Sequence, residues 1–239
     1  MPSPIEFGVY DPREDVAVSE RNLPHWFQPG VAAFITFRTA DSLPAEVLAR
    51  WEREQTDWLA RSVARLFESG AATFSPDHTT SVNSFTETSQ PIVPPQLQRE
   101  FQQLRWQAWQ GHLDACHGAC ALQRPELAKI VAESLCIFDG TRYDLDSFVI
   151  MPNHVHLLVQ FRLGTEPRRQ CGNWQRFTAR RINELLQRRG AFWQSEPFDH
   201  LVRSPEQFTY LQHYIAQNPV KADLSPGSYL YWQRRKSES

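Results

Sequence analysis

Cysteine, methionine and long apolar runs are all scarce in this sequence. Its 239 residues include two methionines and four scattered cysteines, too few for a disulfide framework. No segment approaches the roughly 20 apolar residues that are needed to cross a bilayer. The acidic, polar start of the chain lacks the apolar core of a signal peptide. We therefore expect a cytoplasmic protein with reduced cysteines and no membrane partner.

Two of the cysteines lie close to histidines along the chain. Cys116 and Cys120 are accompanied by His112 and His117, a local set that could indicate zinc. No second Cys/His pair at zinc-finger spacing follows them. Structural or incidental cysteines are therefore the favoured interpretation, and zinc is the minor one.

The formal net charge of −2 argues against a generally basic nucleic-acid binder. The distribution of charge matters more than the sum, because residues 162–203 contain nine arginines against four acidic residues. Such a segment could neutralise DNA phosphates, although a charge-rich helix is more often simply solvated. Both interpretations stay open on charge alone.

Composition divides the chain into an N-terminal arm (1–30), one domain (31–224) and a C-terminal tail (225–239). The arm is punctuated by prolines and shows no periodicity. Residues 69–95 are rich in Ser, Thr and Pro, and they are interpreted as a flexible loop inserted into the domain. The apolar fraction of 41% is sufficient for a globular core.

Apolar periodicity predicts strands that alternate with helices. The predicted strands are 31–38, 143–150, 155–161 and 198–203. The predicted helices are 45–67, 96–110, 125–138, one that contains 174–186 and stops near Gly190, and 204–218. Short strands of this kind interleaved with helices on a mostly antiparallel sheet are an α+β arrangement.

The stretch from Ser147 to Phe161, SFVIMPNHVHLLVQF, organises the chain. It predicts a hairpin whose two strands meet at the turn Met-Pro-Asn. Because strand side chains alternate between faces, His154 and His156 should project from one face while Val155 and its apolar partners enter the core. Two imidazoles at this spacing can share a metal ion, but two half-buried sheet histidines would give the same pattern.

The last helix has a clear start and a polar stripe. Ser204 can cap it and a proline follows in the first turn, while Pro219 predicts an end near Asn218. Tyr210, Tyr214 and Asn218 are spaced four apart and share one face. Packing with a helix-end cap explains that stripe as well as a catalytic role does.

The turn and histidine pair MPNHVH, the link FWQSEPFDHLVR and the C-terminal segment HYIAQNPVKADL together resemble the REP-associated tyrosine transposases. These are a branch of the single-tyrosine HUH nucleases, which also include insertion-sequence transposases. The resemblance extends from Val31 to Leu224. It implies a ferredoxin-like core with a mostly antiparallel four-stranded sheet and packed helices.

The resemblance also implies the site. Tyr214 matches the nucleophile of the family, and His154, His156 and Asn218 match its metal ligands, with Mg²⁺ or Mn²⁺ expected. The candidate DNA-binding residues are Arg176, Arg180, Arg181 and Arg203. For His200, which matches a recurring family histidine, structural support is favoured over catalysis.

The expected function is a metal-dependent single-stranded DNA endonuclease and strand transferase that acts on hairpin-forming repeats through a 5′-phosphotyrosine. The expected partner is single-stranded or hairpin DNA, and both monomer and homodimer stay open. One alternative is a DNA hairpin-binding protein of the same fold that does not cleave. Another is a structural His pair in an unrelated α+β domain. Departures from the family at Gln175, Pro197 and Asp223 bear on DNA affinity and substrate choice.

Overall fold

The computed structural model describes residues 6–14, 17–20, 24–43, 116–195 and 197–235, with nine further positions between 46 and 61. The chain divides into two compact units, one formed by residues 1–42 with 113–239 and the other by 43–112. In the second unit, the described positions between 46 and 61 are helical, as predicted. The predicted loop 69–95 and helix 96–110 lie outside the described residues. All elements named below belong to the first unit.

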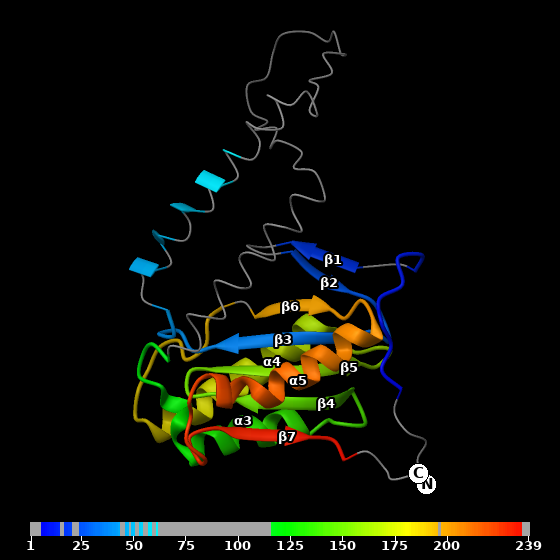
Figure 1. Ribbon diagram of the computed structural model, residues 1–239. Helices are drawn as coiled ribbons and strands as arrows, with labels where there is room; N and C mark the ends of the chain where they lie inside the picture. The colour runs from blue at the N-terminus through cyan, green and yellow to red at the C-terminus, as the bar shows by residue number, and fades with distance from the viewer. Residues whose placement is uncertain are drawn as a thin grey trace, which may run out of the picture. The chain divides into compact units, whose positions relative to one another are not determined.

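A five-stranded antiparallel sheet in the order β6-β3-β5-β4-β7 forms the centre of this unit (Figure 1). Its strands are β3 (Ala32–Arg38), β4 (Tyr143–Ile150), β5 (His154–Phe161), β6 (Phe198–Leu201) and β7 (Leu230–Gln233). The first four strands have the connectivity of a ferredoxin-like core. This confirms the predicted α+β class, and β7 adds a strand to the four that were predicted.

The helices lie on opposite faces of this sheet (Figure 1). They are α3 (Pro125–Cys136), α4 (Pro167–Leu185) and α5 (Pro205–Lys221), and the short 3₁₀ turn η1 (Ala121–Gln123) precedes α3. Helices α3 and α4 cover one face, where Phe37 and Val155 enter the main apolar core together with Trp174 of α4. Helix α5 covers the other face, and its buried stripe includes Leu211 and Ile215.

The hairpin β4–β5 is held from three directions at its turn. The Met151 amide donates to the His154 carbonyl at 2.8 Å within the hairpin. The Leu122 amide donates to the Pro152 carbonyl, and the Thr39 amide donates to the Asn153 carbonyl, both at 2.9 Å. These hydrogen bonds, from within the hairpin, from η1 and from the end of β3, fix the position of His154 at the start of β5.

Both ends of the chain contain strands that the sequence analysis did not predict. In the predicted arm, β1 (Ala17–Glu20) and β2 (Pro24–Phe27) pair as a separate two-stranded sheet. In the predicted tail, β7 pairs with β4, and Trp232 stacks on Phe148 with ring centroids 5.3 Å apart. These strands have four residues each, which is too short for a recognisable alternation.

Helix α5 begins as predicted but ends later. The Ser204 hydroxyl accepts a hydrogen bond from the Gln207 amide and so caps the first turn. The predicted end near Asn218 is wrong, because α5 continues through Pro219 to Lys221. The continuation is possible because the Ala222 amide still donates to the Asn218 carbonyl at 3.1 Å, although proline lacks a donor of its own.

Candidate functional site

The histidine pair lies on β5 and faces α5, on the opposite side of the sheet from the main core. His154 and His156 have no exposed surface, while Val155 and Leu157 point into the core under α3 and α4. The two imidazole rings are 4.6 Å apart at their centroids. The predicted placement of both histidines on one face of a strand is therefore confirmed.

Each imidazole has a buried hydrogen-bond partner for its Nδ1 atom. His154 Nδ1 lies 2.8 Å from the Asn153 side-chain oxygen. His156 Nδ1 lies 2.8 Å from the Thr36 hydroxyl, which β3 places directly opposite in the sheet register. Both rings are thus oriented through Nδ1, which turns their Nε2 atoms toward the space below α5.

Helix α5 brings the tyrosine and the amide of the predicted stripe to this space. Tyr214 is 6% exposed, and its hydroxyl lies 3.5 Å from His156 Nε2. Asn218 has no exposed surface, and neither polar atom of its side chain forms a hydrogen bond of normal geometry among the described residues. Tyr210, one turn before Tyr214, is 54% exposed. The structure therefore separates the two tyrosines, because only Tyr214 reaches the histidines.

Burial keeps both histidines neutral. Burial, and then the positive charge of Arg38, lower the pKa of His154 to about 3, while the Asn218 side chain acts in the opposite direction. Burial and the neighbouring His154 hold the pKa of His156 well below its usual value. Arg38 stands opposite His154 in the β3–β5 register and is itself buried. Neutral imidazoles are the form that binds metal ions.

An aromatic wall closes one side of the site. The Phe34 ring on β3 stacks on His156 with centroids 5.2 Å apart, and Tyr214 meets it edge-on at 5.9 Å. On the other side of Phe34, the ring of His200 on β6 lies at 5.3 Å. Burial and then the charge of Arg203 lower the pKa of His200 to about 4. The His200 ring thus contacts Phe34 of this wall, and its predicted supporting role stays a prediction.

The donor set of the site fits a divalent cation. His154 Nε2 and both polar atoms of the Asn218 side chain are buried and lack a normal hydrogen bond among the described residues. Imidazole nitrogens suit first-row transition metals, and an amide oxygen also suits the harder cations Mg²⁺ and Mn²⁺. The described parts of the chain contain no group of three or more His, Cys, Asp or Glu residues that could hold a metal ion. The third ligand of a cation here would therefore be the amide, in a role that carboxylates often fill.

The predicted DNA-binding arginines lie apart from this site. Arg176, Arg180 and Arg181 are exposed on α4, which covers the opposite face of the sheet (Figure 1). Arg180 and Arg181 both lie near Glu184, at 3.5 and 3.9 Å. Arg203 is exposed just before α5. Their contact with DNA stays a prediction.

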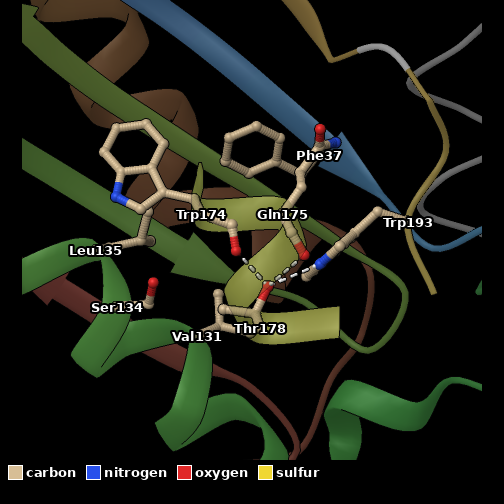
Figure 2. Close-up of a pocket in the computed structure, with 8 residues that line it drawn as sticks. All are labelled: Phe37, Val131, Ser134, Leu135, Trp174, Gln175, Thr178 and Trp193. Atoms are coloured by element: carbon tan, nitrogen blue, oxygen red, sulfur yellow. Dashed lines mark hydrogen bonds between the residues drawn. The ribbon is translucent and has the colours of Figure 1, made fainter. Parts of the chain in front are cut away.

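Three large aromatic residues on α4 and after it are packed inside the protein, which leaves none of them free to stack on an unpaired base. Trp174, Phe192 and Trp193 are at most 6% exposed. Figure 2 shows the small apolar pocket beside Trp174 and Trp193, where the Thr178 hydroxyl accepts a hydrogen bond from the Trp193 indole at 2.8 Å. Its volume of about 10 Å³ holds at most one water molecule. This pocket belongs to the core on the α3–α4 face and is no ligand site.

Sequence reasoning missed three residues of the site. Thr36 and Arg38 depend on the pairing of β3 with β5, which only the folded sheet reveals. Asn153 was noticed as a turn residue, and its place directly before His154 was the available signal for its contact with the histidine. Alternation along residues 31–38 is a signal that could have put Thr36 and Arg38 on one face, but it does not identify their neighbours.

These observations define a class: an α+β protein with a ferredoxin-like sheet on which a histidine pair, a tyrosine and an amide meet beneath one helix. Residues 124–218 match the family model described as "Transposase IS200 like", and these residues include all four of those side chains. This match agrees with the predicted family resemblance over residues 124–218, the segment that holds the histidine pair and helix α5 up to Asn218.

The chain is similar to a solved structure of "the REP associates tyrosine transposase bound to a REP hairpin", with 12% identity and a TM-score of 0.38 over 85% of this chain and 73% of that one. No curated protein sequence matches the chain significantly. Among the described helices, none combines the length and apolarity needed to span a bilayer.

Proposed function

We propose that the chain is a metal-dependent single-stranded DNA endonuclease and strand transferase that acts on hairpin-forming repeat DNA through a 5′-phosphotyrosine at Tyr214. The observation that carries the proposal is the approach of the Tyr214 hydroxyl to His156 Nε2, at 3.5 Å, in a buried site shared with His154 and Asn218. A packing role alone gives no reason for a cluster of so many polar atoms below α5, several of them without a normal hydrogen bond.

A DNA phosphodiester resists attack because its charge repels nucleophiles and its leaving oxygen must be stabilised. When bound, a divalent cation such as Mg²⁺ or Mn²⁺ would polarise a non-bridging phosphate oxygen and help to orient the phosphate. His154 and His156 would hold this cation through Nε2, and Asn218 would hold it through the amide oxygen. The depressed pKa values of both histidines support the proposal, since the rings remain unprotonated at neutral pH.

Tyr214 would act as the nucleophile. Its phenolic oxygen forms the new bond to phosphorus while the bond from phosphorus to the 3′ oxygen breaks. The proton that the phenol loses is balanced by the proton that the departing 3′ oxygen gains. The phosphotyrosine ester conserves the free energy of the cleaved phosphodiester bond. A 3′-hydroxyl of another strand can therefore attack this ester and complete strand transfer.

The test is incubation of the protein with a labelled hairpin oligonucleotide from beside its own gene, with Mn²⁺ or with EDTA, followed by a denaturing gel. We expect a protease-sensitive shifted band that needs Mn²⁺. Tyr214→Phe should bind the hairpin and form no band, because only the nucleophilic oxygen is removed. Tyr210→Phe is the matched control and should form the band, because this exposed residue lies one turn away.

The outcomes separate the proposed enzyme from its alternative. A band that persists in Tyr214→Phe would assign the nucleophile elsewhere and refute this mechanism. Hairpin binding without any cleavage, across Mg²⁺ and Mn²⁺, would indicate a DNA hairpin-binding protein of the same fold. Absence of binding would remove hairpin DNA as the partner.

A further inference from the structure

The side chain of Asn153 connects the histidine site to a loop that the proposed reaction does not use. Asn153 has no exposed surface. Its amide nitrogen donates to the His117 carbonyl at 3.0 Å, and its amide oxygen lies 2.8 Å from His154 Nδ1. The loop is the Cys116–Cys120 segment, which the sequence marked only as a weak zinc candidate.

The polarity of these contacts determines the form of the His154 ring. The carbonyl of His117 can only accept a hydrogen bond, so it requires the nitrogen of the Asn153 amide. The amide oxygen then faces His154, and an oxygen without a proton requires a donor at Nδ1. His154 must therefore carry its proton on Nδ1, which leaves a lone pair on Nε2. At His156 the partner is the Thr36 hydroxyl, which donates or accepts and so selects neither form.

The loop that supplies the carbonyl is itself fixed. The Ala119 amide donates to the Asp41 carboxylate at 2.8 Å. Gly118 has a φ of +91°, and a Cβ atom there would lie 2.5 Å from the Asp41 carbonyl oxygen. Only glycine permits this close approach between the two segments. Consequently the His117 carbonyl is held in place by contacts that are independent of the histidine pair.

We infer that Asn153 and the His117 carbonyl form a positioning relay that keeps the His154 proton on Nδ1 and presents Nε2 as a metal ligand. The Cys116–Cys120 loop then serves the site through its backbone and needs no zinc. The part of the inference that makes Nε2 a metal ligand rests on the proposed function. The part that assigns the tautomer does not, because the tautomer is a property of the metal-free protein. Partners that orient a ligating histidine change metal affinity by about 10- to 100-fold.

Nitrogen-15 NMR of the metal-free protein, with histidine labelled, tests the relay directly. The His154 signals are assigned by their absence in His154→Gln. We expect the Nδ1-protonated form in the natural protein and the Nε2-protonated form, alone or mixed, in Asn153→Ala. A His154 ring protonated on Nε2 in the natural protein would overturn the inference, whether or not any variant folds.

Titration with Mn²⁺ gives the second measurement. Asn153→Ala should weaken Mn²⁺ binding by about 10- to 100-fold. Asn153→Asp keeps an acceptor for His154 and should retain the Nδ1-protonated form, although it loses the bond to His117. Unchanged Mn²⁺ affinity in a folded Asn153→Ala protein would refute the positioning role.

Two glycine-to-alanine substitutions distinguish the contribution of the Cys116–Cys120 loop from that of the Asn153 side chain. Gly118→Ala should displace the His117 carbonyl and weaken Mn²⁺ binding without altering Asn153. Gly164→Ala is the matched control, since Gly164 also has a positive φ, of +82°, but has no atom within 4 Å of the added Cβ. If both variants bind Mn²⁺ equally well, the loop has no part in the relay. The expected tautomer combined with no Mn²⁺ binding in the natural protein would count against the proposed nuclease and leave the tautomer assignment intact.

Discussion

Replacement of Asn218 by leucine should stabilise the metal-free protein and remove its response to metal. The Asn218 amide is buried with two polar atoms that lack a normal hydrogen bond among the described residues. A buried unsatisfied polar group costs about 1–3 kcal/mol, and an apolar side chain of similar shape relieves that cost. In a chain of this size, each kcal/mol shifts the Tm by about 2–4 °C. We therefore expect Asn218→Leu to raise the metal-free Tm by about 2–12 °C.

Addition of Mn²⁺ should reverse this advantage. A cation at a hundredfold excess over its Kd stabilises the natural protein by about 2.7 kcal/mol. Asn218→Leu lacks the third ligand and should gain much less. The assay is thermal unfolding followed by circular dichroism, with EDTA and with increasing Mn²⁺. Asn173→Leu on α4 is the control, since its amide lies on the opposite side of the sheet, and it should leave both values nearly unchanged. A lower metal-free Tm in Asn218→Leu would show that the amide is not an unsatisfied group in the metal-free protein. A Mn²⁺ shift equal to that of the natural protein would show that the amide is no ligand.

Two further predictions concern pH and DNA affinity. The folded-state pKa values of His154 and His200, about 3 and about 4, lie below the ordinary value of 6.5, so the unfolded chain binds more protons below pH 6.5. The free energy of unfolding should therefore be highest above pH 6.5 and fall toward pH 4, by up to about 1.4 kcal/mol per pH unit for each such histidine. Urea unfolding at several pH values measures this dependence. A pH profile in His154→Gln that is no flatter than that of the natural protein would contradict the prediction. If Arg180 and Arg181 neutralise phosphates, their double replacement by alanine should reduce the slope of log affinity against log salt concentration by about 1–2. Lys129→Ala, on α3, is the control in the hairpin-binding titration, and an unchanged slope in the arginine variant would remove α4 from the DNA contact.

The parts of the fold that were predicted from sequence are those with strong local signals. The β4–β5 hairpin has a period-2 alternation around a proline turn, so both strands and the faces of His154 and His156 could be predicted. The start of α5 could be predicted because Ser204 and Pro205 are local signals. The sheet order could only be inferred from the family resemblance, which the strand connectivity agrees with.

The remaining features depend on tertiary contacts. Thr36 meets His156 only because β3 pairs with β5 in one register, and register is not encoded in a single strand. The extension of α5 past Pro219 goes with burial of that proline, where packing outweighs the local preference. The contact of Asn153 with His117 joins residues 36 positions apart, and no local pattern specifies it.

The short strand β7 has a consequence for self-association. It pairs along Ser147–Ile150 of β4 and so covers backbone groups that would otherwise be open to another chain. As the new edge it has only four residues, and the charged Arg235 follows it two positions after its end. Short length and adjacent positive charge are features that discourage edge-to-edge aggregation of sheets. Residues 230–235 therefore protect the solubility of the folded protein at a sheet edge that lies away from the histidine site.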